Sequence, residues 1–167
     1  MSTNERTNIS VRKARREDMK EVYALLKGLA EFENLLDQVK IDEHTLERDG
    51  FDTDNPLFGC FVAEMSDGPL VGYALYFHSY STWEGASILL EDIYVHPDYR
   101  KNGVGKQLFL AVARAAKDMD MKRIDFHVLS WNPAVDFYKK MGAVNLTQKE
   151  DWNLFRLDHE SINALFP

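Results

Sequence analysis

The sequence predicts an α/β fold in which helices cover a mixed, mostly antiparallel β-sheet. Three observations lead to this class. Segments with strand-like alternation follow segments with helical periodicity, two strand-like segments flank a turn cluster, and a strand–helix–strand unit comes after them. Such an order is typical of layered α/β proteins. At 167 residues the chain suits one compact domain, so we expect residues 9–167 to form it, after a flexible polar tail at residues 1–8.

The first half of the chain supplies one strand, two helices and a hairpin. Residues 9–15 alternate apolar and basic side chains, which predicts a strand. Apolar residues then recur at helical spacing from 17 to 33, and residues 41–48 form a second, short helix that ends at Gly50. Residues 57–64 and 70–80 are rich in aromatic and β-branched side chains and flank a Ser-Asp-Gly-Pro turn, so they predict an antiparallel hairpin.

The second half continues with alternating elements. We expect a strand at residues 87–95, a helix at 103–117 and a strand at 123–129. A short helix at 133–141 begins with Asn132 as its cap and Pro133 at its first position. Residues 152–157 are predicted to form a closing strand. The expected total is six to seven strands with about four helices.

Composition excludes several classes of protein. The net charge of −7 argues against nucleic acid as a partner, because phosphate binding requires a basic surface. No apolar run is long enough to span a membrane, and the first ten residues lack a hydrophobic targeting core. Cys60 is the single cysteine and the five histidines lack ligand spacing, so we expect no disulfide, no metal site and a cytoplasmic location. Cys60 itself is expected to be a small core residue.

A glycine-containing loop between a strand and a helix is the most informative segment. Residues 89–106 run from a buried strand through a proline turn into a basic loop that opens a helix, and a helix N-terminus of this kind binds anions. A P-loop would require glycine and Ser or Thr where Arg100 and Gln107 stand, and a dinucleotide fingerprint would require glycine in place of Leu108. The glycine spacing alone also permits a plain tight turn with solvated lysines.

The wider pattern is more specific. Val-x-Pro-x-Tyr-Arg-x-x-Gly-Val-Gly, starting at Val95, resembles the acetyl-CoA loop of the GNAT acetyltransferases, and residues 131–143, with Asn, Phe-Tyr and a glycine turn, resemble the second cofactor motif of that family. The resemblance implies the GNAT fold and acetyl-CoA as co-substrate. The residues it assigns to cofactor binding are Ile93, Tyr94, Val95, Arg100, Lys101, Asn102, Gly103, Val104, Gly105, Lys106, Asn132, Pro133, Ala134, Val135 and Tyr138.

The resemblance also assigns catalytic roles. Tyr138 would lie near the thioester sulfur, where a phenol with a pKa of about 10 suits protonation of a departing thiolate; the alternative is a packed core aromatic. Six positions instead of the usual seven separate Asn132 from Tyr138, so helix capping competes with a cofactor role for Asn132. Glu91 and Asp92 interrupt an apolar strand, and one of them is expected to face the ligand, attract the substrate ammonium and take its proton. A strand-edge salt bridge is the alternative.

Several further segments resemble the diamine acetyltransferase branch of the family. They are Leu-Ala-Glu-Phe-Glu at 29–33, Asp-Gln-Val-Lys-Ile at 37–41, Asp-Gly-Phe at 49–51, Tyr-Ser-Thr-Trp at 80–83 and Leu-Glu-Asp-Ile-Tyr-Val at 90–95. The resemblance implies a homodimer with its active sites near the subunit boundary. It implies that Glu91 assists deprotonation of the amine, and it assigns to substrate binding Phe32, Glu33, Trp83, Glu91 and Asp92.

The substrate expected from this resemblance is a small cationic amine. Ser81 and Thr82 precede Trp83, where polyamine-selective relatives tend to carry an acidic residue and proline, so we expect thialysine (S-aminoethyl-cysteine) or lysine-like amines to be preferred over spermidine. Three alternatives stay open: a spermidine/spermine acetyltransferase, a protein lysine or N-terminal acetyltransferase, and a CoA-binding module without turnover.

Overall fold

The computed structural model describes residues 9–66 and 68–166, so the predicted tail at residues 1–8 lies outside the described part of the chain. The chain divides into two compact units, residues 1–127 and 128–167.

One five-stranded sheet forms the centre of the first unit. Its strands lie in chain order: β1 (Ile9–Lys13), β2 (Gly59–Met65), β3 (Leu70–Ser81), β4 (Gly85–Val95) and β5 (Ile124–Phe126). All neighbours pair antiparallel except β4 and β5, which pair parallel. The predicted mixed, mostly antiparallel sheet and the β2–β3 hairpin are therefore confirmed, although the described residues contain five strands instead of six or seven.

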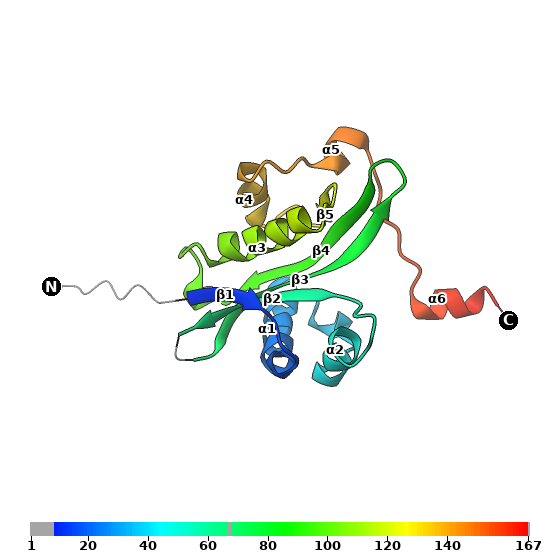
Figure 1. Ribbon diagram of the computed structural model, residues 1–167. Coiled ribbons are helices and arrows are strands. Elements are labelled where there is room, and N and C mark those ends of the chain that lie inside the picture. The colour runs from blue at the N-terminus through cyan, green and yellow to red at the C-terminus, as the bar shows by residue number, and fades with distance from the viewer. Residues whose placement is uncertain (1–8, 67, 167) are drawn as a thin grey trace. The chain divides into compact units, whose positions relative to one another are not determined.

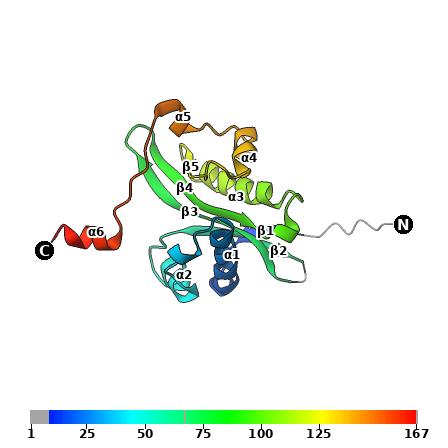
Figure 2. The same cartoon turned by 180° about the vertical axis from the view of Figure 1, so that it is seen from behind.

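Helices cover both faces of this sheet. α1 (Met19–Phe32) and α2 (Glu43–Gly50) lie on one face, and α3 (Val104–Asp118) lies on the other (Figures 1 and 2). Short 3-10 turns at Arg16–Asp18, Leu36–Gln38 and Pro97–Tyr99 join these elements. Each of these three helices begins and ends within two residues of the sequence prediction because its apolar stripe marks its extent. At α2 a cap adds to this signal, since Asp42 accepts the N–H of Thr45.

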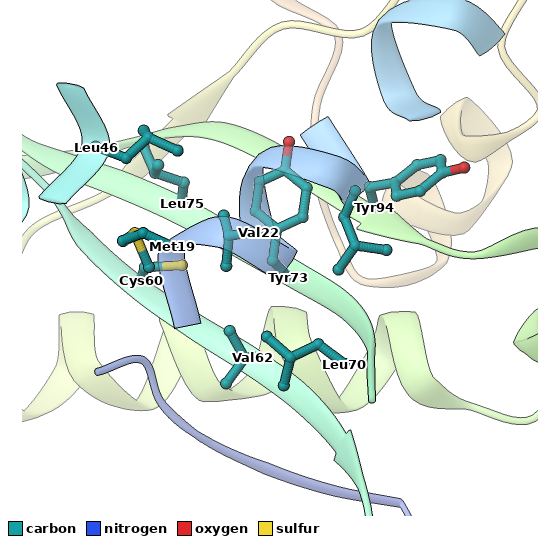
Figure 3. Close-up of a cluster of buried hydrophobic side chains, with 10 residues drawn as sticks. Met19, Val22, Leu46, Cys60, Val62, Leu70, Tyr73, Leu75 and Tyr94 are labelled. Atoms are coloured by element: carbon teal, nitrogen blue, oxygen red, sulfur yellow. The ribbon is translucent and has the colours of Figure 1, made fainter. Parts of the chain in front are cut away.

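The core between α1, α2 and the sheet is apolar apart from two tyrosine hydroxyls and a thiol. Met19, Val22, Val62 and Tyr73 are fully buried there. Figure 3 shows the ring of Tyr73 inside this cluster, with its hydroxyl pointing away from Val62 and Leu70. Cys60 belongs to the same cluster, as expected of a small core residue, and burial raises the pKa of its thiol.

The second unit is helical in its described part. It contains α4 (Ala134–Lys140), α5 (Leu146–Glu150) and α6 (His159–Ala164). The predicted strand at residues 152–157 is wrong: this segment has no regular structure, and Trp152, Leu154, Phe155 and Leu157 are exposed. Its apolar pattern suits a strand, but a strand requires a neighbour with which to share hydrogen bonds, and none pairs with it here.

Two smaller differences concern the same half of the chain. β5 is three residues long, whereas residues 123–129 were predicted to be a strand. α5 and α6 were not foreseen because each is too short to show helical periodicity; each is marked only by a cap, Asn145 for α5 and Asp158 for α6. Among the described residues, no helix combines the length and the apolar character needed to cross a bilayer.

Candidate active site

A β-bulge separates the two carboxylates of β4. Asp92 is paired with Leu75 and Leu90 is paired with Tyr76, so Glu91 is the extra residue between them. Alternation along the strand predicted that one of the two acids faces the ligand side. Asp92 is half-buried on the face of the sheet that carries Leu75 and α1, whereas Glu91, the bulged residue, is exposed. Bulges commonly redirect side chains beside active sites.

Asp92 is a partly desolvated carboxylate with one strong hydrogen bond. The hydroxyl of Tyr73 donates to its Oδ2 at 2.9 Å. Burial raises the pKa of Asp92 to about 6, the negative charges of Glu91 and Glu33 act in the same direction, and the hydrogen bond from Tyr73 opposes them. Asp92 is thus ionised at neutral pH but protonated in mild acid.

Glu33 follows the last residue of α1 and adds a second acid to this region. Burial raises the pKa of Glu33 as well. Among the residues that the structure describes, no lysine, arginine or histidine forms an ion pair with Asp92 or Glu33. Partly buried carboxylates without a cationic partner are unfavourable, and a ligand with a positive charge stabilises them.

The edge of β4 beyond Leu90 is open on the side of β5. The pairing of β4 with β5 covers only Ile88, Leu89 and Leu90, so residues 91–95 have no strand partner on that side in the described structure. Ile93, Tyr94 and Val95, which the sequence assigned to cofactor binding, therefore lie along an open strand edge. An extended ligand with amide groups can pair with such an edge as an added strand would.

Arg100 connects the loop after β4 to the end of α1. Its Nε donates to the carbonyl oxygen of Val95 at 2.9 Å, and its guanidinium carbon lies 5.0 Å from the ring centre of Phe32 and 5.4 Å from that of Tyr94. Phe32 was predicted to line the amine pocket and Arg100 to bind the cofactor, so the two predicted sites meet at this stack. An open groove of about 640 Å³ lies beside it, lined among others by Lys27, Gly28, Phe32, Tyr94 and Arg100.

The N-terminus of α3 has the features of an anion site. Gly103 precedes the helix with φ of +79°, Lys101 has φ of +65°, and no side chain caps the helix. The first N–H groups of a helix have no partner within it, and together with the helix dipole they attract an anion. A Cβ built on Gly103 would contact nothing within 4 Å, so the space beside it is open. Lys101, Asn102 and Lys106 are exposed around it.

The residues of the second predicted cofactor motif lie in the second unit. The side-chain oxygen of Asn132 accepts the N–H of Ala134, the first residue of α4, at 2.9 Å, although the N-cap position of this helix is Pro133 and not Asn132 as predicted. Pro133 has helical backbone angles directly before Ala134. Tyr138 is 7% exposed on α4, and its ring packs edge-on against Phe137 with centres 5.1 Å apart. Val135 is half-buried in the first turn of α4.

Trp83 is the predicted substrate-binding residue that the chain does not bring to the carboxylates. It occupies the tight turn between β3 and β4 and is 77% exposed. From Gly85, next to this turn, to Asp92 the strand runs seven residues, or about 23 Å. Trp83 therefore lies at the opposite end of the hairpin from Asp92.

Sequence reasoning did not single out Tyr73. Two signals point to it in retrospect: a tyrosine in an otherwise apolar strand needs a partner for its hydroxyl, and an aspartate in an apolar strand needs a donor. Nothing in the sequence says that the two side chains meet, because the bulge at Glu91 sets the register. The described residues contain no cluster of three or more metal-ligating side chains.

Comparisons with known proteins identify a family whose profile covers most of the chain. Residues 19–143 match the profile of the acetyltransferase (GNAT) family. Thialysine N-epsilon-acetyltransferase of Bos taurus is 42% identical over 165 residues, which cover 94% of this chain and 96% of that protein. Spermidine/spermine N(1)-acetyltransferase-like protein 1 of Homo sapiens is 37% identical over 159 residues, covering 91% of this chain and 23% of that protein.

A solved structure shares the fold at low sequence identity. The integron cassette protein VCH_CASS6 from the mobile metagenome of V. cholerae superposes with a TM-score of 0.73 at 19% identity, covering 95% of this chain and 97% of that one.

Proposed function

Since this chain belongs to the GNAT acetyltransferase family, we propose that it transfers the acetyl group of acetyl-CoA to the primary amine of a small cationic substrate, with thialysine or lysine-like amines preferred over polyamines. The observation that carries this proposal is the pair of partly buried acids, Asp92 and Glu33, which have no cationic partner among the described residues. The relatives named thialysine N-epsilon-acetyltransferase support the choice of substrate class.

GNAT acetyltransferases use acetyl-CoA as co-substrate, and the loop before α3 fits its pyrophosphate. The backbone amides from Lys101 to Lys106 would hold the phosphates at the uncapped helix end, with the charges of Lys101 and Lys106 beside them. Residues 93–95, on the open edge of β4, would bind the pantetheine arm through backbone groups. In the second unit, residues 132–135 and Tyr138 stay predicted cofactor-binding residues. The bound molecule supplies an acetyl group on a thioester.

The amine is bound and activated by the acidic residues. A primary amine arrives as an ammonium ion, which Asp92 and Glu33 attract while the ring of Phe32 lines the pocket. The ammonium must lose a proton before its nitrogen can attack the acetyl carbonyl carbon. Glu91, exposed at the bulge, takes this proton through a water molecule. As the carbon–sulfur bond breaks, the hydroxyl of Tyr138 gives its proton to the departing thiolate, and the second proton that the nitrogen loses as the amide forms returns the Tyr138 phenolate to its protonated form.

An assay over a panel of amines tests the proposed function. We expect acetyl-CoA to release free thiol in the presence of thialysine, with lysine next and spermidine last in kcat/KM at equal ionic strength. The second ammonium of a polyamine such as spermidine would have no carboxylate of its own in the site and would therefore lack a charged hydrogen bond. Such a bond is worth about 1.5–3 kcal/mol, which corresponds to about tenfold or more in kcat/KM. A clear preference for spermidine would contradict the proposed selectivity. If none of the amines on the panel caused release of thiol, the proposed function itself would be contradicted.

The spermidine/spermine alternative rests on a specific observation. The human relative named spermidine/spermine N(1)-acetyltransferase-like protein 1 is 37% identical to this chain. Because both alternatives use the same cofactor and the same kind of amine, the ratio of the two kcat/KM values separates them.

A homodimer forms the second part of the proposal. Trp83 in the β3–β4 turn and Tyr80 near the end of β3 are each 77% exposed, and the irregular segment 152–157 exposes Phe155 at 90% and Leu154 at 73%. Exposed aromatic side chains in such number are typical of protein contact surfaces. In a dimer Trp83 can serve the amine site of the second copy, since its own Asp92 lies at the other end of the hairpin. We also keep as predictions that residues 9–167 act as one acetyltransferase domain and that the protein is cytoplasmic.

Light scattering on the purified protein tests the dimer. We expect a mass twice that of the 19.3 kDa chain, and a shift toward the monomer when Leu154 and Phe155 are both replaced by serine. Replacing the exposed Leu57 by serine is the control, because it removes a comparable apolar side chain, 66% exposed, from the first unit. A monomeric wild-type protein at micromolar concentration would contradict this part of the proposal.

A further inference from the structure

Tyr73 is a fully buried tyrosine to which the proposed reaction gives no role. It stands in β3, its side chain is 0% exposed, and its ring packs among Val22 and the other apolar residues of the core (Figure 3). A phenylalanine would fill the same space. The hydroxyl is therefore the part of Tyr73 that needs an explanation, because burying a polar group is unfavourable unless it has a partner.

The partner of this hydroxyl is the carboxylate of Asp92. Tyr73 and Tyr94 are directly opposite each other in the β3–β4 register, and Leu75 is opposite Asp92, so the four residues share one face of the sheet. The Tyr73 hydroxyl lies 2.9 Å from Oδ2 of Asp92. Burial raises the pKa of Tyr73 well above its ordinary value, so the hydroxyl stays protonated and donates this bond.

The other groups around Asp92 all disfavour its charge. Glu33 approaches from the end of α1 and Glu91 from the same strand, and both raise the pKa of Asp92. Cys60 from β2 is close enough to feel the charge of Asp92, but its buried thiol is protonated at neutral pH. Within the described residues, the Tyr73 hydroxyl is the one side-chain donor to this carboxylate.

We infer that Tyr73 is a positioning residue of the amine site: its hydroxyl holds the Asp92 carboxylate ionised and in one orientation, ready to receive the ammonium of the substrate. This inference rests on the proposed function, because it takes Asp92 as the group that meets the amine. Without the hydroxyl, Asp92 keeps its burial and its two acidic neighbours but loses the interaction that favours its negative charge. It then binds a proton at a pH where the wild-type carboxylate is free.

The variant Tyr73→Phe tests this inference through the pH dependence of kcat/KM for the amine. Loss of a charged hydrogen bond is expected to raise the pKa of Asp92 by about one unit or more. Relative to wild type, kcat/KM then falls about fivefold at pH 6, about twofold at pH 7 and not measurably at pH 8.5, as follows from the ionised fractions for a one-unit shift. The protonation of the amine itself cancels in this ratio because both proteins use the same substrate.

Two controls separate positioning from mere packing. Tyr76→Phe removes a hydroxyl from a neighbouring residue of β3 that is 8% exposed, and its kcat/KM ratio to wild type is expected to stay constant with pH. The variant Asp92→Asn has no carboxylate at this position. The fall of kcat/KM toward low pH that protonation of Asp92 causes is therefore expected to disappear, and kcat/KM is expected to be lower than in the wild type by the same factor throughout. This second variant keeps the test valid if Tyr73→Phe fails to fold.

Carbon-13 NMR of the aspartate carboxyl groups gives a readout that needs no activity. The signal that Asp92→Asn removes is expected to titrate near pH 6 in the wild type and about one unit higher in Tyr73→Phe. An unmoved carboxyl titration, or a kcat/KM ratio that does not vary with pH in Tyr73→Phe, would overturn the inference. If the wild type acetylates no amine at all, it is the proposed function that fails, and the NMR titration still decides whether Tyr73 controls Asp92.

Discussion

Replacing Tyr138 by phenylalanine is expected to lower kcat by about two to four orders of magnitude, the usual contribution of a positioned general acid. In Tyr138→Phe the departing thiolate would leave without the proton that the hydroxyl of Tyr138 is proposed to donate. Tyr138 is 7% exposed on α4, so phenylalanine keeps the buried ring and removes only the hydroxyl. The affinity for CoA, measured by titration calorimetry, is expected to change little, because a single neutral hydrogen bond is worth about 1 kcal/mol.

A buried tyrosine of similar exposure provides the control for this experiment. Tyr76 is 8% exposed in β3, and Tyr76→Phe is expected to keep kcat within about a factor of two while showing a similar melting temperature to Tyr138→Phe. Turnover by Tyr138→Phe at the rate of Tyr76→Phe would remove Tyr138 as the acid and leave it as a packed aromatic residue. A proportional loss of kcat and CoA affinity would point to a cofactor-binding role instead.

Replacing Gly103 by alanine is expected to weaken CoA binding by about tenfold or more. Gly103 has φ of +79°, a conformation that costs an alanine about 1–2 kcal/mol, so the loop before α3 shifts to relieve it. Such a shift misplaces backbone N–H groups that are proposed to hold the pyrophosphate. Each charged hydrogen bond lost costs about 1.5–3 kcal/mol, that is, tenfold or more in affinity.

Gly85 offers a matched control because its backbone also has a positive φ, at a position outside the loop before α3. Its φ is +102°, and a Cβ built on it contacts nothing within 4 Å, as at Gly103. Gly85→Ala is therefore expected to lose a similar amount of stability while its dissociation constant for CoA stays at the wild-type value. Equal affinity for CoA in both variants would show that the loop before α3 does not hold the cofactor.

The fold was largely predictable because the signals along the first unit are local and agree with one another. The apolar stripe of α1, the hairpin around residues 66–69 and the glycine loop before α3 each combine periodicity with an identifiable start or stop. The second unit was less predictable. Residues 152–157 carry a strand-like pattern, but pairing depends on a neighbour that local sequence does not reveal, and α5 and α6 are too short for a periodic signal.

The candidate site shows the same division between local and non-local information. The glycine loop and the uncapped start of α3 follow directly from the pattern of residues 95–105, whereas the relation of Asp92 to Tyr73 depends on register. Glu91 and Asp92 were recognised as unusual acids in an apolar strand, but which of them is half-buried beside Tyr73 depends on the register that the bulge sets. The stack of Arg100 on Phe32 and Tyr94 likewise joins residues whose distance in the sequence hides their contact.

The proposed cofactor site depends most on the uncapped start of α3 as the binding place of a pyrophosphate. Calorimetric titration of the wild-type protein with CoA, beside 3′-dephospho-CoA and pantetheine, tests it directly. We expect one CoA site per chain, binding of 3′-dephospho-CoA that retains most of this affinity, and a loss of at least a hundredfold with pantetheine, which lacks both phosphates of the bridge and with them several charged hydrogen bonds of about 1.5–3 kcal/mol each. Folded protein that binds no CoA, or binds pantetheine as tightly as CoA, would contradict it.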